Sequence, residues 1–125
     1  MGADGEGTIS STAFWWDANE TARAFNTAFH DKAVAKGYAR VEPSQFDAAT
    51  HSIVRIYAAA MRHAGVSGDP AHLSEERVAI RNALAGGIAV ETVEGVIKFD
   101  EAGDAMKHVI ALEVRDGAWH PILMD

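Results

Sequence analysis

The residues of this chain that could do chemistry are histidines, carboxylates and aromatic side chains. The six histidines stand far apart, with no His-Glu-x-x-His motif and no pair at i and i+4 that could hold zinc on a helix. The acidic run Asp100, Glu101 and Asp104 has the composition of a calcium loop, but it lacks the alternating carboxylates and the closing glutamate. We therefore interpret the histidines as solvated or locally bonded and the acidic run as a solvated turn, and we predict no metal site and no cofactor.

Nucleophilic catalysis has no candidate residue here. The chain has no cysteine, which excludes a thiol nucleophile and a disulfide framework, and no serine stands in a Gly-x-Ser-x-Gly elbow. The early glycines form no nucleotide-binding fingerprint, because no strand precedes them and no helix follows closely. The sequence predicts that the protein is not an enzyme.

The aromatic residues indicate binding more than catalysis. In the run Phe14, Trp15 and Trp16, strand alternation sends at least one ring to the opposite face from its neighbours. Either Phe14 and Trp16 pack in a core, or the rings line a ligand or interdomain surface. Phe46 and Asp47 fall in the first turn of an expected helix, where a ring and a helix N-terminus suit a zwitterionic solute. Structure alone also explains both, because Phe46 continues an apolar stripe and Asp47 completes a capping box.

Capping signals and apolar periodicity predict three helices. The first begins with the capping box Asp17-x-x-Glu20 and ends near Gly37. The second begins at Ser44-x-x-Asp47 and ends at Gly65, and its apolar stripe is Phe46, Ala49, Ile53, Tyr57, Ala60 and Ala64. The third follows Asp69-Pro70 and closes at Gly86-Gly87.

Strands are expected before and after the helices. Residues 8–16, 95–99, 108–115 and 119–123 are rich in β-branched and aromatic residues, and Asp116-Gly117 is a strong hairpin signal. The order of strand, three helices, then strand and hairpin predicts an α/β fold. Because a lone pair of strands is marginal in water, we expect this sheet to be completed within a larger fold or by association.

Charge and hydropathy exclude several classes of partner. The formal net charge of -7 arises with only 11 basic residues, which are scattered singly, and this argues against nucleic acid and anionic lipid as partners. The opening residues 1–7 lack the basic and apolar regions of a signal peptide, and no window approaches the roughly 18 apolar residues of a membrane helix. We expect neither an export signal nor an anchor in this sequence.

Four segments, residues 5–17, 21–25, 43–53 and 93–104, together resemble the last third of the leucine/isoleucine/valine-binding family of ABC-importer receptors. The resemblance implies a fragment of a two-lobed periplasmic-binding-protein fold with the ligand in a cleft. It implies one partial domain, in which residues 1–18 form a strand of the C-terminal lobe. Residues 19–99 would be a helical segment of the N-terminal lobe with one strand, and residues 100–125 the return crossing and C-terminal hairpin.

The same resemblance implies capture of an amino acid, an amide or a related small polar solute for a membrane permease, without catalysis, in the periplasm or cell envelope. It implies ligand contacts from Phe46, Asp47 and Trp16, whereas His51 stands where the family commonly has tyrosine. Because the upstream two-thirds supplies the grip on the ligand in the family, we expect this piece to bind weakly or not at all. The alternative is an interaction module that forms a homodimer or swaps strands, and no amino acid would stabilise that oligomer.

Overall fold

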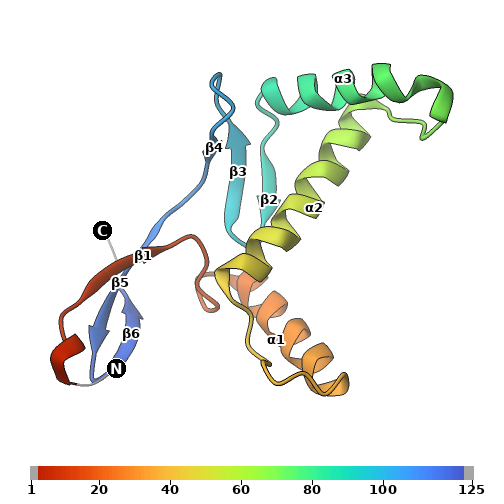
Figure 1. Cartoon of the computed structure of the whole chain (residues 1–125). Helices are drawn as coiled ribbons and strands as arrows, with labels where there is room; N and C mark the ends of the chain where they lie inside the picture. Colours follow the sequence, from red (N-terminus) through yellow and green to blue (C-terminus); the bar gives the residue numbers. More distant parts are fainter. Residues whose placement is uncertain (1–2, 123–125) are drawn as a thin grey trace. The chain divides into compact units, whose positions relative to one another are not determined.

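The computed structural model describes residues 3–122, which form a mixed α/β structure, as the sequence predicts (Figure 1). The helices are α1 (Glu20–Ala35), α2 (Gln45–Ala64) and α3 (Leu73–Ala85), with short 3₁₀ turns η1 (Ala3–Gly5) and η2 (Pro70–His72). The strands are β1 (Ile9–Thr12), β2 (Val90–Thr92), β3 (Gly95–Phe99), β4 (Ala105–Met106), β5 (Ile110–Arg115) and β6 (Ala118–Pro121). The chain divides into two compact units, Met1–Phe46 with Val109–Asp125, and Asp47–His108.

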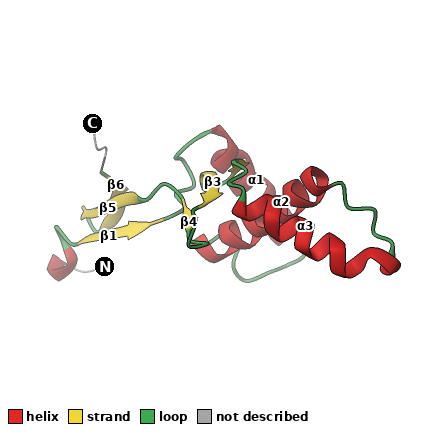
Figure 2. Ribbon diagram, turned by 90° about the horizontal axis from the view of Figure 1, so that it is seen from above, coloured by secondary structure: helices red, strands yellow, loops and turns green. Residues whose placement is uncertain are grey.

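The first unit contains an antiparallel sheet in the order β1-β5-β6, whose strands lie side by side in Figure 2. Leu112 and Val114 alternate along β5 and are buried, which gives this sheet one apolar face. The hairpin predicted at Asp116-Gly117 is confirmed. Both residues have positive φ, 53° and 74°, as a type I′ turn requires, and the Glu6 carboxylate accepts both of their backbone N–H groups. Of the strand expected at 119–123, Leu123 lies outside the described residues.

Strand β1 is shorter than predicted, because the chain leaves the sheet after Thr12. The Thr12 hydroxyl oxygen lies 3.3 Å from the Phe14 nitrogen and 3.0 Å from the Phe14 carbonyl oxygen. Such a local side-chain turn competes with the next ladder hydrogen bonds of the sheet. Residues 13–18 consequently form turns that carry Trp15 and Trp16 away from strand geometry.

Helix α1 starts two residues later than its predicted cap would require. Asn19 is the N-cap, and its side-chain oxygen accepts the Ala22 N–H at 2.9 Å. Asp17, the predicted cap, instead forms an ion pair with Arg23 at 3.0 Å. Asn and Asp cap helices about equally well, so the sequence pattern could not choose between them.

The second unit contains a small antiparallel sheet in the order β2-β3-β4. Strand β3 was predicted correctly, whereas β2 and β4 were missed, so residues 19–99 hold a second strand beyond the single one expected. Thr92 and Gly95 close the β2–β3 turn, where the Thr92 hydroxyl donates to the Gly95 carbonyl at 2.8 Å. Val93, Glu94 and Ile97 are buried beside this turn.

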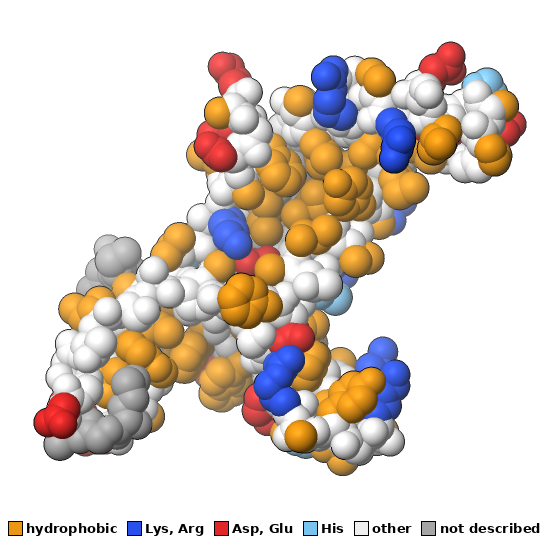
Figure 3. All heavy atoms as spheres, viewed as in Figure 1, with side chains coloured by type: hydrophobic (Ala, Val, Ile, Leu, Met, Phe, Trp, Pro, Cys, Tyr) orange, Lys and Arg blue, Asp and Glu red, His pale blue; other side chains and the backbone are white. Residues whose placement is uncertain are grey.

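Helix α2 runs as predicted, but of the predicted apolar stripe only Ala60 is buried. The buried residues are Ala48, Ser52, Ile56 and Ala60. Most of the large residues of the predicted stripe, including Ile53 and Tyr57, are exposed, and Figure 3 shows hydrophobic side chains gathered over α2. Apolar residues occupy both the buried face of the helix and the exposed face beside it, so periodicity alone could not identify the packed face.

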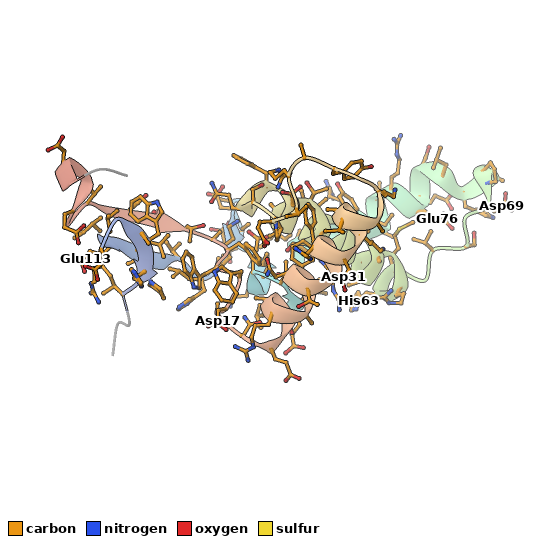
Figure 4. The ribbon with its side chains drawn as sticks, turned by 90° about the horizontal axis from the view of Figure 1, so that it is seen from below. Asp17, Asp31, His63, Asp69, Glu76 and Glu113 are labelled. Carbon is orange, nitrogen blue, oxygen red and sulfur yellow. The ribbon has the colours of Figure 1, made fainter. Side chains whose placement is uncertain are left out.

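A hydrogen-bonded loop joins α2 to α3. Glu76 accepts the backbone N–H and the hydroxyl of Ser67, both at 2.6 Å, and Ser67 Oγ accepts the Asp69 N–H at 3.1 Å. Figure 4 shows Asp69 and Glu76 near each other at the start of α3. Asp69 caps the 3₁₀ turn η2, so the helix predicted after Asp69-Pro70 begins as 3₁₀ and becomes α-helical at Leu73.

The division into compact units falls at 46/47 and 108/109, whereas the lobe boundaries implied by the resemblance fall at 18/19 and 99/100. The assignment of these segments to lobes stays a prediction. Within residues 3–122, no helix is both long enough and apolar enough to cross a bilayer.

Candidate ligand-binding site

The first unit contains an open pocket of about 510 Å³. Three separate segments form it: the turn that follows β1, the middle of α1, and the loop that leads into α2. Its lining residues are Phe14, Trp15, Trp16, Asn26, Glu42, Pro43 and Gln45. The volume is within the range of small-molecule sites, about 300–1,000 Å³.

An aromatic cluster holds the floor of this pocket in place. Phe14 is buried and meets Phe25 edge to face, with ring centroids 5.7 Å apart, and Phe25 lies 6.1 Å from Phe29. The Arg40 guanidinium covers the Phe29 ring at 5.5 Å. This packing fixes Phe14 between β1 and α1, and with it the start of the Trp15-Trp16 turn.

The loop side of the pocket is tied to the strand side. Thr12 Oγ1 lies 3.2 Å from Gln45 Oε1, which joins the end of β1 to the first residue of α2. Arg40 also donates to the Glu42 carbonyl at 2.7 Å, which constrains the loop before Pro43. The three segments are therefore connected by side-chain contacts as well as by the chain.

The chemistry of the lining favours a small solute that has an apolar part and a hydrogen-bond-donating or cationic group. The aromatic rings offer apolar and cation-attracting surfaces, and Asn26 and Gln45 add amide groups. Glu42 is the carboxylate of the lining, and no Lys, Arg or His side chain is among the described residues that form it. An amino or amide group fits this lining better than an isolated anion does.

The residues predicted from sequence divide between this pocket and its surroundings. Of the two alternatives left open for the aromatic run, Phe14 follows the first and packs in a core, whereas Trp16 is 49% exposed and lines the pocket. Phe46 is 74% exposed in the first turn of α2 and does not line the pocket, and Asp47 is half-buried. The ligand-binding role of Trp16, Phe46 and Asp47 stays a prediction.

Sequence reasoning missed Asn26, Glu42 and Gln45. Asn26 lies inside α1 with no motif around it, and Glu42 lies in a loop without any periodic pattern. Gln45 fell within the segment 43–53 that carries the family resemblance, and this was the only sequence signal that pointed to it.

The other groups of polar residues have structural roles. Asp100 Oδ1 accepts the backbone N–H groups of Ala102 at 3.0 Å and Asp104 at 2.8 Å, which confirms the predicted turn. Among the described residues, no three His, Asp or Glu side chains come together as metal ligands would. Burial lowers the pKa of His51, and the charge of Arg55 lowers it further, so this imidazole is neutral at neutral pH.

Comparison with protein families decides what this fold is. The model of a family described as periplasmic binding protein matches residues 1–118. The chain belongs to this periplasmic binding protein family. The match confirms both the resemblance and the fold class predicted from sequence.

Solved structures of similar proteins cover nearly the whole chain. A leucine binding protein from Thermotoga maritima is 25% identical with a TM-score of 0.70, and the alignment covers 98% of this chain and 31% of that protein. A protein assigned to branched-chain amino acid ABC transport from Rhodospirillum rubrum is 28% identical with a TM-score of 0.72, and the alignment covers 97% of this chain and 32% of that one. A solute binding protein from R. palustris in complex with benzoate shares only the fold, at 16% identity and a TM-score of 0.67, with 97% and 30% covered.

The chain spans about a third of the length of these solved proteins. No curated protein matches it by sequence.

Proposed function

We propose that this chain is part of the solute-binding component of an ABC importer, which captures an amino acid or a related small polar solute and delivers it to a membrane permease without catalysis. The observation that carries this proposal is the family match over residues 1–118. Membership of this family also supports a location in the periplasm or elsewhere in the cell envelope. The permease is the partner that such a role requires.

We infer that the solute carries an amino group and an apolar side chain. The relatives at 25% and 28% identity are named for leucine binding and branched-chain amino acid transport. In this chain, Glu42 suits an ammonium group, and Trp15 and Trp16 suit an apolar side chain. Benzoate, the ligand of the R. palustris protein of similar fold, fits less well, because it has no cationic or hydrogen-bond-donating group for Glu42.

Trp16 and Phe46 are the residues of the first unit that we assign to the ligand. Trp16 already lines the pocket, and Phe46 places an exposed ring on the first turn of α2, directly after Gln45. Asp47, the next residue, lies in the first turn of α2, where a carboxylate favours helix formation. We assign Asp47 a role in holding this turn beside the solute.

The segments are proposed to divide between two lobes as the family resemblance implies, with residues 1–18 and 100–125 in one lobe and 19–99 in the other. The pairing of β1 with β5 supports this division, because it joins the first and last segments in one sheet. Limited proteolysis tests it: early cleavage at 17–19 and 100–104 is expected for lobe crossings. Early cleavage confined to 38–44 would contradict it.

Thermal unfolding against a panel of amino acids and small amides tests solute capture. A solute that binds only the folded chain raises the melting temperature by mass action. With a dissociation constant of about 1 mM, solute at about 10 mM stabilises by about 1.4 kcal/mol, a shift of several degrees for a chain of this size. We expect the shift for leucine-like amino acids and none for benzoate.

Matched variants locate the binding. Trp16→Ala and Phe46→Ala are expected to abolish the shift without lowering the melting temperature of the solute-free chain by a similar amount. Tyr38→Ala removes an exposed aromatic ring of the same unit that lies outside both the pocket lining and the first turn of α2, and it should keep the shift. A shift that persists in both test variants would refute the assignment of these residues.

A further inference from the structure

The loop that joins α1 to α2 supplies one wall of the pocket. We call residues 37–44 the strap, which runs back along α1 and contributes Glu42 and Pro43 to the lining (Figure 1). At its first end, the Tyr38 N–H donates to the Ala33 carbonyl at 3.0 Å and completes the C-terminal turn of α1. Its other end continues directly into α2. The contacts of the middle of the strap therefore decide where Glu42 lies.

Arg40 holds the middle of the strap. Its guanidinium lies over the Phe29 ring of α1, 5.5 Å from the ring centroid, and its Nη1 donates to the Glu42 carbonyl at 2.7 Å. Phe29 in turn lies against Phe25, whose ring meets that of Phe14 on the pocket floor. This series of contacts starts and ends at residues of the pocket lining, so it connects the aromatic floor to the wall that carries Glu42.

The contact at the Glu42 carbonyl also limits where the Glu42 carboxylate can go. Because Glu42 precedes Pro43, the α region is disfavoured for its backbone, and extended conformations remain. With the carbonyl also held by Arg40, the carboxylate moves chiefly by rotation about the bonds of its own side chain. The carboxylate is thereby kept at the pocket in the absence of solute, and such preorganisation increases affinity.

We propose that Arg40 is a positioning residue, which holds Glu42 at the pocket so that its carboxylate receives the amino group of the solute. A guanidinium suits this task, because its flat face lies on a ring while N–H groups at its edge donate to a carbonyl. A lysine ammonium has no such separate face and edge. The effect of Arg40 on solute affinity rests on the proposed function, whereas its effect on the strap does not.

Leucine titration of two matched variants tests the effect on affinity. Arg40→Met should raise the dissociation constant for leucine, measured from the indole N–H signals of Trp15 and Trp16, by about fivefold or more. Lys36→Met is the control and should leave the constant unchanged, because the Lys36 ammonium lies over Tyr38, at 5.9 Å, outside the pocket lining. Both variants lose one positive charge, and this loss alone would strengthen the attraction for an ammonium group. Weaker binding confined to Arg40→Met therefore indicates lost positioning.

A double-mutant cycle tests whether Arg40 acts through Glu42. Glu42→Gln should weaken leucine binding, and adding Arg40→Met to it should change the dissociation constant by less than about twofold, because the carboxylate to be positioned is already gone. Arg40→Lys keeps the positive charge but should bind leucine almost as weakly as Arg40→Met. Losses that add in the double variant, or parental affinity in Arg40→Lys, would overturn the proposal. Far-UV circular dichroism checks that each variant keeps its helices.

A measurement without solute separates this inference from the proposed function. In ¹⁵N relaxation of the solute-free chain, the order parameters of Val41, Glu42 and Ser44 should fall from about 0.85 toward about 0.6 in Arg40→Met and stay unchanged in Lys36→Met. This result supports the positioning role even if leucine fails to bind the parent chain, a failure that would contradict solute capture alone. Unchanged order parameters in Arg40→Met would overturn the positioning role even where leucine binds.

Discussion

Lys107 donates a hydrogen bond to Glu94 across 2.9 Å, and the Glu94 side chain is only 2% exposed. Glu94 lies in the turn between β2 and β3, and Lys107 follows β4 directly. The ion pair therefore connects the β2–β3 turn to the chain that follows β4. A carboxylate this deeply buried is stable only while its partner is present.

Removing the Lys107 cation while keeping the Glu94 carboxylate should destabilise the folded chain. Lys107→Met leaves the Glu94 carboxylate buried without its partner and should lower the free energy of unfolding by about 1–3 kcal/mol, measured by urea denaturation. Adding Glu94→Gln to this variant should restore part of the loss. Lys98→Met, at an exposed position of β3, is the control and should change stability by less than about 0.5 kcal/mol. Equal losses in the two lysine variants would contradict this account.

The Ser67–Glu76 contact makes stability depend on pH in the acidic range. Hydrogen bonds from the Ser67 hydroxyl and backbone N–H lower the pKa of Glu76. A lowered folded-state pKa means that the stabilisation is present above the unfolded value and is lost as pH falls through the folded value. Between about pH 5 and pH 3, Glu76→Gln should show a smaller fall in urea midpoint than the parent chain. Glu91→Gln, exposed on β2, should behave like the parent, and a parallel fall in all three chains would exclude the linkage.

His51 makes a second contribution to the pH dependence of stability, at a pH nearer to neutral. Burial, with a smaller effect of Arg55, lowers its pKa from 6.5. The unfolded chain then binds the proton more readily, so stability is full above about pH 6.5 and declines as pH falls below it. His51→Asn should reduce the difference in melting temperature between about pH 7.5 and pH 5.5. His120→Asn, exposed on β6, should not reduce it, and an unchanged difference in the His51 variant would rule out this contribution.

Local signals predicted the elements of this fold better than their packing. Caps and glycines placed the helices approximately, although Asn19 rather than Asp17 caps α1. Asp116-Gly117 identified a hairpin turn whose positive φ angles the structure confirms. Strands β2 and β4 have three and two residues, too short for an alternating pattern to be seen. The sequence did not identify the packed face of α2, because apolar residues flank Ala60 in both directions around the helix. Only tertiary contacts decide which of these two faces is buried.

The candidate site was only partly accessible to sequence reasoning. Trp16 was anticipated as an aromatic residue with a binding role, and it lines the pocket. Asn26 and Glu42 were not anticipated, because they join Trp16 only after β1, α1 and the loop before α2 come together. Residues that converge from separate segments carry no common motif in the sequence.

The most direct test of solute capture uses the three tryptophans of the chain as reporters. Trp15 and Trp16 line the pocket, whereas Trp119 lies in β6 and does not. In ¹⁵N NMR spectra recorded during a leucine titration, the indole N–H signals of Trp15 and Trp16 should shift in a saturable manner while that of Trp119 stays in place. Unmoved signals for Trp15 and Trp16 at about 20 mM leucine and throughout the amino-acid panel, or a shift of Trp119 alone, would contradict solute capture by this chain.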